Sequence, residues 1–352
     1  ITKVWNFCDF TNFFCYLCGP TDTKAVNVKT DMKEVFVVYD VAVREFAGEF
    51  CNKLRARSLG ELALICDEPH KTLNEVEHIC RALMNAGADK NCTLIAIGGG
   101  VCSDVCGLAA SLYKRGIDFE IVPTTLLAMA DASVGGKNGV NLDGVKNMMG
   151  TFKLPRKIHI RKEVLRTLPR KEVLSGSAEI LKTFLLFDEK LYNRAVGVFS
   201  ELAKIDNGQD GQAELEEMLG EAAELAEKAA KYKRKVVKRD LFDRGRRHIL
   251  NFGHTFAHAI EWRSHEAVSH GEAVSMGIIK SLRMREKEGW GEKGLADRVR
   301  DDFKRCNLPV ELPYSDEELQ EALKNDKKAE EGAVDFVFLQ RIGKPFRKKI
   351  RL

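Results

Sequence analysis

Short apolar runs alternate with amphipathic segments through the first half of the chain. The runs that predict β-strands are residues 35–40 (VFVVYD), 62–66 (LALIC), 93–100 (TLIAIGGG) and 118–125 (DFEIVPTT). Between them lie helical patterns such as residues 72–88, where apolar positions recur at helical spacing and a glycine stands near the end. This alternation predicts a parallel sheet with crossover helices.

The pattern changes after residue 155. The sequence that follows is rich in Ala, Glu, Leu and Lys, as in residues 213–232, and it has almost no strand pattern until residues 334–339 (VDFVFL). We therefore expect two domains. The first is an α/β domain with a Rossmann-like parallel sheet over residues 1–168, and the second is an all-α domain over residues 169–352.

Composition agrees with a cytoplasmic globular protein. The 352 residues suffice for two domains, 44% are hydrophobic and 31% are charged, and no apolar run reaches the ~20 residues of a transmembrane helix. The ten cysteines are scattered through apolar stretches, which predicts reduced thiols rather than a disulfide framework. Cys15 and Cys18 form one CxxC, but a structural zinc or redox role lacks the second pair that such sites commonly have.

Charge is nearly balanced overall but concentrated in one place. The 56 basic and 52 acidic residues leave a net charge of +4, so no global field favours nucleic acid. Ten lysines and arginines nevertheless fall between Lys228 and Arg247. This run fits a solvated helix face, a nucleic-acid surface without interleaved aromatics, or a subset of cations that faces a phosphorylated or carboxylated substrate.

Two glycine-rich segments can bind anions. Gly98, Gly99 and Gly100 follow an apolar strand and precede a helix, where backbone N–H groups can approach a pyrophosphate; the alternative is a tight turn without a ligand. Residues 122–141 place two threonines at a strand end and then the sequence Gly-Gly-Lys. Such a loop can hold an anion, or its lysine can simply be solvated.

Five of the eight histidines fall between residues 248 and 270. His254 and His258 are four residues apart on one helical face, so spacing alone favours both as metal ligands over a hydrogen-bonded core pair. A third ligand must then come from elsewhere. Glu179 is a candidate because an unpaired acid among apolar neighbours is costly to bury, and its alternative is an ordinary helix pair with Lys182.

Together these segments resemble the 3-dehydroquinate synthase family. The resemblance rests on GGGVCSDVCGLAASLYKRG, residues 122–141, KNMMGTF, SGSAEILK, and LNFGHTFAHAIE with SHGEA, and it covers roughly residues 35–345. It implies a dehydroquinate synthase-like fold, with NAD on the α/β domain, Zn²⁺ or Co²⁺ on the helical domain and the active site between them. The implied partners are a phosphorylated keto-sugar acid and a second copy in a homodimer, with no nucleic acid and no membrane.

The resemblance also assigns roles residue by residue. It implies metal ligation by Glu179, His254 and His270, which moves His258 from ligand to catalytic contact. It implies catalytic roles for Lys137, Lys182, Lys233, Asp243, Arg247, Asn251 and His258. It implies substrate binding by Arg115, Asp131, Asn147 and Lys328. It implies NAD binding by Asp40, Glu68, Lys71, Gly99, Gly100, Asp104, Thr124, Thr125 and Lys146.

Three positions depart from the family pattern near the expected site. Asn138 stands where Thr is usual, Asp243 where Glu is expected, and Ala257 where Gly usually precedes the second histidine. Asp243 reaches about one methylene less far than Glu would. Ala257 adds a methyl group where helices approach closely.

The implied reaction converts 3-deoxy-D-arabino-heptulosonate 7-phosphate to 3-dehydroquinate and phosphate in the shikimate pathway. It combines transient oxidation by NAD, phosphate elimination, reduction and an aldol closure. Rival functions are a valiolone- or inosose-type cyclase, a glycerol-dehydrogenase-like enzyme, a non-catalytic NAD or zinc sensor, and a nucleic-acid-binding module. Asn251 and His258 argue against the valiolone type, and KNMMG and SGSAEILK argue against the dehydrogenase.

Overall fold

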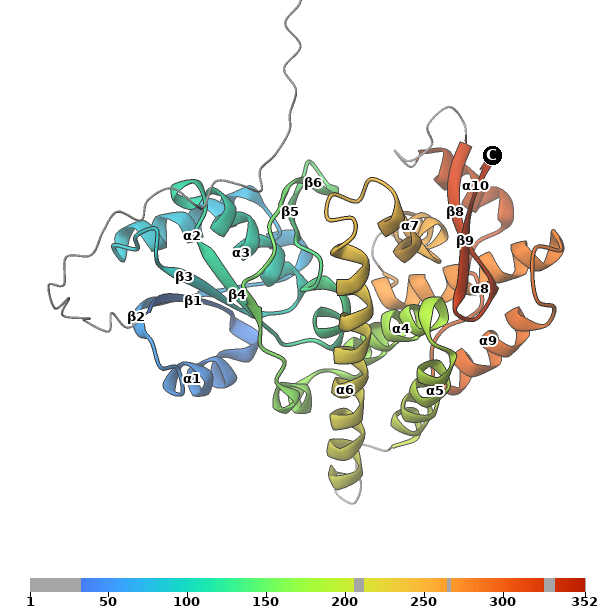
Figure 1. The fold of residues 1–352 in the computed structure, drawn as a ribbon, viewed down its shortest axis with the longest axis horizontal. Coiled ribbons are helices and arrows are strands. Elements are labelled where there is room, and N and C mark those ends of the chain that lie inside the picture. Colours follow the sequence, from blue (N-terminus) through green and yellow to red (C-terminus); the bar gives the residue numbers. More distant parts are fainter. Residues whose placement is uncertain (1–32, 206–211, 265–266, 326–332, 352) are drawn as a thin grey trace, which may run out of the picture. The chain divides into compact units, whose positions relative to one another are not determined.

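A five-stranded parallel sheet organises the first half of the chain (Figure 1). The computed structural model describes residues 33–205, 212–264, 267–325 and 333–351, so Cys15, Cys18 and Lys328 lie outside the described residues. The strand order is β2-β1-β3-β4-β7, and every neighbouring pair is parallel. The strands are β1 (Glu34–Asp40), β2 (Arg57–Leu64), β3 (Thr93–Gly98), β4 (Asp118–Pro123) and β7 (Lys157–Ile158).

Helices cover both faces of this sheet. Because side chains alternate along a strand, Val37 and Ile95 point to the face of α1 (Arg44–Asn52), whereas Val38 and Leu94 point to the opposite face. That opposite face is covered by α2 (Leu73–Asn85) and α3 (Gly100–Leu112). The expected fold class, an α/β domain with a parallel sheet followed by a helical half, is confirmed.

Helix α2 shows how local sequence fixes such an element. Thr72 caps its start, with the side-chain oxygen 3.4 Å from the backbone nitrogen of Glu75. Val76, Ile79 and Leu83 recur three and four residues apart and are almost completely buried. The cap and the apolar stripe together make this helix predictable from sequence.

Two antiparallel hairpins add to the sheet and the helices. The first pairs β5 (Lys137–Leu142) with β6 (Val145–Phe152), and the second pairs β8 (Ala333–Arg341) with β9 (Lys344–Arg351). Of these four strands, only β8 was predicted from the sequence. Most side chains of β6 and β9 are exposed or half-buried, so neither strand has the apolar alternation that identifies strands. The turn Asp143-Gly144 has positive φ at both residues, the Asp-Gly signal of a two-residue hairpin.

Helices make up most of the second half of the chain, and they pack around one large apolar core. They are α4 (Arg170–Phe187), α5 (Glu189–Lys204), α6 (Gln212–Val237), α7 (His254–Arg263), α8 (His270–Lys287), α9 (Leu295–Arg305) and α10 (Asp316–Asn325). The long helix α6 contacts α4 and α5 and also the short π-helix Ala128–Ala132, which follows β4 (Figure 1). Through these contacts α6 connects the helical half to the carboxyl edge of the sheet.

Helices α7 and α8 approach each other closely at two glycines. A Cβ atom on Gly277 would lie 2.2 Å from the carbonyl oxygen of Gly253, so a larger residue would force the helices apart. Gly253 itself has φ 79°, which favours glycine just before α7 begins. This contact packs the amino end of α7, with His254, against α8, while Gly271, next to His270, packs on the backbone of Ser175 in α4.

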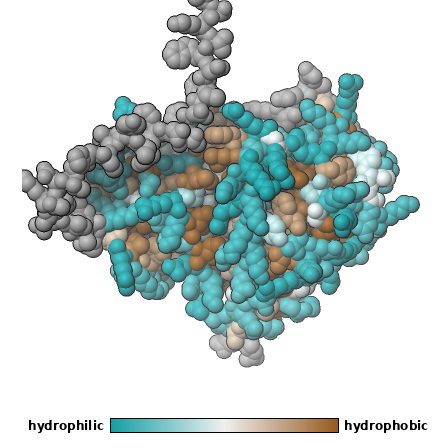
Figure 2. Space-filling model, viewed as in Figure 1, coloured by the Kyte–Doolittle hydropathy of each residue, from teal (hydrophilic) through white to brown (hydrophobic). Residues whose placement is uncertain are grey.

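The face of the molecule seen in Figure 2 is largely hydrophilic, with apolar residues between the hydrophilic ones. Among the described helices, none combines the length and the apolar composition needed to cross a membrane. Within the same residues all seven cysteines are free thiols: Cys51, Cys66, Cys80, Cys92, Cys102, Cys106 and Cys306.

Candidate active site

The expected NAD-binding residues cluster at the carboxyl edge of the sheet. Asp40 ends β1, Lys71 follows β2, Gly99 follows β3 and Thr125 follows β4. The strand order reverses between β1 and β3, and this switch point is where open α/β sheets bind ligands. A Cβ atom on Gly98 would lie 3.4 Å from the Cβ of Asp40, so the two sides of the switch point are in contact.

The glycines after β3 leave the start of α3 open to a ligand. Gly99 is the N-cap of this 13-residue helix, and no side chain caps it. A Cβ atom on Gly99 would lie 3.3 Å from Cγ2 of Thr125, and one on Gly98 would lie 2.4 Å from the Cβ of Cys102. Bare backbone N–H groups at a helix start favour phosphate groups. These residues therefore fit the pyrophosphate of a dinucleotide.

A polar network joins this edge to the β5–β6 hairpin. Lys71 Nζ lies 2.6 Å from Asp104 Oδ2 and donates a hydrogen bond of 2.6 Å to Asn147 Oδ1. Asn141 Nδ2 donates to Glu68 Oε1 at 2.8 Å, and Asn141 Oδ1 accepts from the backbone nitrogen of Asn147 at 2.9 Å. Burial raises the pKa of Asp104, and the Lys71 ammonium opposes that shift. Asn141 was not among the predicted site residues, and its role is visible only through these contacts.

Three helices bring Glu179, His254 and His270 together. Glu179 Oε1 lies 3.4 Å from His254 Nε2 and 3.3 Å from His270 Nε2, and one ligand atom from each residue lies within 4.8 Å of the others. The partner that His254 was expected to have from spacing, His258, is not in this group. Its ring centroid lies 5.7 Å from that of His254.

The chemistry of this cluster fits a divalent cation. Glu179 is fully buried, and neither of its oxygens accepts a hydrogen bond from a described residue, although Lys182 Nζ lies 2.6 Å from Oε2. Burial opposes ionisation of Glu179, but the Lys182 ammonium and His270 lower its pKa to about 2. Burial lowers the pKa of His254 well below its usual value. An ionised carboxylate and imidazole nitrogens are a donor set that Zn²⁺ prefers.

Each histidine of the cluster is oriented through its other ring nitrogen. His254 Nδ1 lies 3.3 Å from the carbonyl oxygen of Phe252, and His270 Nδ1 lies 3.4 Å from Glu261 Oε1. Such partners direct Nε2 at a metal and fix the ring. Glu261 was not among the predicted site residues. It stands inside the motif LNFGHTFAHAIE, but nothing in the sequence pairs it with His270.

Buried cations lie next to the cluster. Lys233 Nζ lies 2.7 Å from Asp131 Oδ2 and donates to the Asp131 carbonyl oxygen at 2.8 Å. Arg247 Nη1 donates to the carbonyl oxygens of Gly135 and Leu241, both at 2.9 Å. Gly135 has φ 136°, and a Cβ there would lie 2.4 Å from Arg247 Nη2, so the guanidinium packs directly against the Gly-Gly-Lys turn.

The three departures from the family pattern have local explanations. Asn138 is buried and donates to the carbonyl oxygens of Gly136 at 3.1 Å and Lys153 at 2.9 Å, so it fixes the start of β5. Ala257 is fully buried, so its methyl group is accommodated. Asp243, although short, forms an ion pair with Lys137.

Other predicted residues lie at the margins. Asn251 ends the 3₁₀ turn Arg246–Asn251, just before α7. Burial raises the pKa of the Glu261 carboxyl, but the contact with His270 lowers it below its usual value. Lys146 of β6 is close enough to Glu261 to lower this pKa slightly further. Arg115 follows α3 and precedes β4, which places it at the opposite edge of the sheet from the glycines. The roles assigned to all these residues stay predictions.

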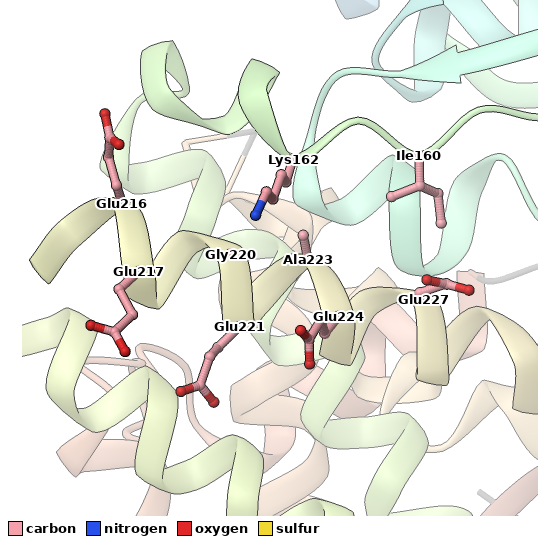
Figure 3. A pocket seen from close by; sticks show the side chains of 9 residues that line it. All are labelled: Ile160, Lys162, Glu216, Glu217, Gly220, Glu221, Ala223, Glu224 and Glu227. Carbon is pink, nitrogen blue, oxygen red and sulfur yellow. The ribbon is translucent and has the colours of Figure 1, made fainter. Parts of the chain in front are cut away.

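A separate hollow of about 450 Å³ lies along the first half of α6 (Figure 3). Glutamates of one helix line it, with Ile160 and Lys162 on the facing segment. Glu216 is about 25 Å along the helix from Lys233, at 1.5 Å per residue. Several of these glutamates pair with arginines, as Glu221 does with Arg194 at 2.9 Å, so this is a salt-bridged surface apart from the site.

The sheet edge, the cluster and the buried cations define a class of protein: an enzyme built to hold a dinucleotide, a divalent metal and an anionic substrate. Two family models are more specific. The model described as 3-dehydroquinate synthase N-terminal matches residues 61–175, and the one described as 3-dehydroquinate synthase C-terminal matches residues 176–329. The chain belongs to the 3-dehydroquinate synthase family, which confirms the resemblance inferred from its motifs.

Curated relatives and a solved structure agree. A 3-dehydroquinate synthase of Pyrococcus abyssi is 39% identical over 277 residues, covering 79% of this chain and 77% of the relative. One from Synechocystis sp. is 34% identical over 317 residues, covering 88% and 85%. A 2-epi-5-epi-valiolone synthase from Streptomyces hygroscopicus subsp. jinggangensis 5008, solved with NAD⁺ and Zn²⁺ bound, superimposes with a TM-score of 0.78 at 26% identity, covering 93% of this chain and 90% of that chain.

Proposed function

We propose that this chain is a 3-dehydroquinate synthase, a lyase that converts 3-deoxy-D-arabino-heptulosonate 7-phosphate to 3-dehydroquinate and phosphate. The observation that carries the proposal is the convergence of Glu179, His254 and His270 beside the buried cations Lys182 and Lys233. Family membership and relatives at 34–39% identity support it. The substrate it requires, a phosphorylated keto-sugar acid, is anionic at both ends and suits a site lined by lysines and an arginine.

The residues present fit both groups that the reaction needs. Glu179, His254 and His270 would hold Zn²⁺ or Co²⁺, which polarises substrate oxygens as a Lewis acid. Asp40, Gly99 and the start of α3 would hold NAD, which takes a hydride from the substrate and returns it. Their support in the structure is the buried Glu179 carboxylate, whose oxygens accept no hydrogen bond from a described residue, and the glycine cradle that a Cβ would fill.

The protein's own cations supply the electrostatics of phosphate elimination. Lys182 and Lys233 are each fixed by a carboxylate, and Arg247 is fixed by backbone carbonyls. An ammonium group has three donors, so an anchored lysine keeps at least one for a ligand. Charges that are held in place before the reaction stabilise developing negative charge without reorganising. Holding the flexible substrate in one conformer also serves the final ring closure.

We also propose the organisation expected from sequence: domains over residues 1–168 and 169–352, and a cytoplasmic homodimer that binds neither nucleic acid nor membranes. The two family models meet at residues 175 and 176, close to the proposed boundary. The near balance of 56 basic and 52 acidic residues supports the exclusion of nucleic acid. Sedimentation of the purified chain tests the dimer, and salt-sensitive retention on DNA or RNA would contradict the exclusion.

A related cyclase of the valiolone type is the rival function, because one such enzyme has the same fold. Sequence identity favours the proposal, with 39% to a 3-dehydroquinate synthase against 26% to the valiolone synthase. The deciding experiment incubates the protein with the heptulosonate phosphate, NAD⁺ and Zn²⁺ and identifies the product. Formation of 3-dehydroquinate over many turnovers supports the proposal. Formation of a valiolone product from a sugar phosphate instead would assign the rival, and binding without turnover would indicate a sensor.

One expected result concerns the stoichiometry of NAD. Because the hydride is taken from and returned to the same substrate, an amount of NAD⁺ equal to the enzyme should support many turnovers. Phosphate release should therefore continue while absorbance at the NADH wavelength stays flat. Accumulation of one NADH per phosphate would instead identify an ordinary dehydrogenase.

A second expected result concerns Glu261. Glu261→Gln keeps the shape of the side chain but removes the charge that faces His270 Nδ1, so the affinity for Zn²⁺ should fall about 10- to 100-fold. Competition with a chromophoric chelator measures that affinity directly. Glu288→Gln, at an exposed position after α8, is the matched control. Equal affinities in the two variants would show that Glu261 does not support the metal site.

A further inference from the structure

The loop between α6 and α7 is folded tightly upon itself. The carboxylate of Asp240 accepts hydrogen bonds from the backbone nitrogens of Arg244 at 3.0 Å, Gly245 at 2.9 Å and Arg247 at 3.0 Å. Asp243, inside this loop, has φ 55°, a left-handed conformation that is uncommon outside glycine. Such a conformation persists only where the surroundings hold it.

Two residues of this loop contact the Gly-Gly-Lys turn, which lies in the first half of the chain. Asp243 pairs with Lys137, the first residue of β5. Arg247 donates to the carbonyl oxygen of Gly135 at 2.9 Å. The position of the loop therefore sets the position of Lys137 and of the Arg247 guanidinium, two of the cations proposed to face the substrate.

The C-terminal hairpin β8–β9 holds the loop from the other side. Arg347 Nη1 donates to the carbonyl oxygen of Gly245 at 2.7 Å, and Nε donates to Asp335 Oδ2 at 2.9 Å. Nη2 donates to the same carboxylate oxygen, so Asp335 fixes the guanidinium plane. His248 extends the contact, because Nε2 donates to the Asp243 carbonyl oxygen at 2.8 Å while Nδ1 lies 4.0 Å from Asp335 Oδ2.

The Asp335–Arg347 pair does not serve the apolar core. The hairpin packs into that core through Val334, Phe336 and Phe338, which are nearly or fully buried. The side chains of Asp335 and Arg347 remain 26% and 35% exposed, on the side of the hairpin that meets the loop. Their strands also lie outside the matched family segments, which end at residue 329.

We propose that Arg347 and Asp335 are positioning residues for the anion-binding part of the active site. Together they hold the loop 240–248 in place, and we call this pair of residues the latch. Through Asp243 and Arg247 the loop in turn fixes the turn that carries Lys137. This inference rests on the proposed function, since it gives the latch the task of aligning cations for a phosphorylated substrate. The two residues act through the loop and do not touch the substrate.

The test compares Arg347→Met and Asp335→Asn with Arg341→Met, an exposed arginine at the closed end of the same hairpin. The two latch variants should lower kcat/KM for the heptulosonate phosphate about 10-fold, because misplaced positioning groups cost rate without contacting the chemistry. The inhibition constant of inorganic phosphate should rise in parallel. Amide hydrogen exchange of residues 240–248 should accelerate, while the melting temperature of each latch variant should match that of Arg341→Met.

Two further variants separate a latch from a general loss of stability. Arg347→Lys keeps the charge but not the planar fork, so it should recover only part of the activity. The double variant Arg347→Met/Asp335→Asn should be no worse than Arg347→Met alone, since that change already removes the contacts of Arg347 with both Gly245 and Asp335. The proposal is overturned if Arg347→Met matches Arg341→Met in kcat/KM and in exchange, or if activity falls only in step with melting temperature. If the wild-type protein does not release phosphate, the proposed function fails, and the exchange measurement still tests the latch.

Discussion

His254→Ala is expected to abolish phosphate release and zinc binding together, and Glu179→Ala and His270→Ala should do the same. Each change removes one of three protein donors whose ligand atoms converge within 4.8 Å. Loss of a supporting residue behind a metal ligand already costs about 10- to 100-fold, so loss of a ligand itself should exceed that range. Phosphate release in a coupled assay and zinc content by elemental analysis measure the two effects separately.

The control for these changes is a histidine of the same chain outside the cluster. His78 stands on an exposed face of α2, with 54% of its side chain accessible, so His78→Ala should leave both quantities unchanged. Dialysis of the wild-type protein against a chelator should remove activity, and Zn²⁺ or Co²⁺ should restore it. Full turnover in a preparation shown to be free of metal would refute the assignment.

Four of the five strands of the sheet and helices such as α2 and α6 could be predicted because their signals are local. The buried strands β1 and β3 read as continuous apolar runs, which parallel strands covered on both faces require. Helix α2 carries its apolar stripe within 13 residues, and its cap, Thr72, directly precedes them. Strand β9 could not be found in this way. Its sequence, KPFRKKIR, is largely basic, and it forms a strand because β8 pairs with it.

The candidate metal cluster shows what residue spacing within one helix can and cannot predict. His254 and His258 share one helix face, so the sequence pattern pairs them. The structure instead brings in His270 from the start of α8, because Gly253 and Gly277 let the two helices come into contact. Spacing within one helix contains no information about this contact. The resemblance to a family predicted the group of Glu179, His254 and His270 that the structure shows. Family motifs reflect long-range packing, which the spacing of residues in one sequence does not reveal.

Supporting residues were the hardest to foresee. Glu261, Asn141 and Arg347 are ordinary polar residues in sequence, and each acquires a role only through a contact between different elements of the fold. Asn141 reaches Glu68 across 73 residues, and Arg347 reaches Gly245 across 102. No motif marks such pairs, because many polar residues could supply the same hydrogen bond.

Within the basic run from Lys228 to Arg247, the structure distinguishes buried from exposed cations, which the sequence alone could not do. Lys233 and Arg247 are largely buried and anchored, whereas Lys238 is exposed beyond the end of α6. Arg247→Ala is therefore expected to lower kcat/KM by roughly 10- to 150-fold, the equivalent of losing one charged hydrogen bond to a substrate anion, and Lys238→Ala should be nearly silent. Steady-state kinetics with the heptulosonate phosphate measures both.

Arg247 also donates to two backbone carbonyl groups, so its loss lowers stability as well as activity. The melting temperature of each variant separates these effects, because assays well below it report on the folded protein alone. Arg247→Lys adds a second test: it retains the charge but cannot make the same paired contacts, so it should recover part of the catalytic loss and little of the stability. Equal kinetic losses in Arg247→Ala and Lys238→Ala would show that burial does not distinguish the functional members of this run. Retention of full activity in a destabilised Arg247→Ala would assign the arginine to structure alone.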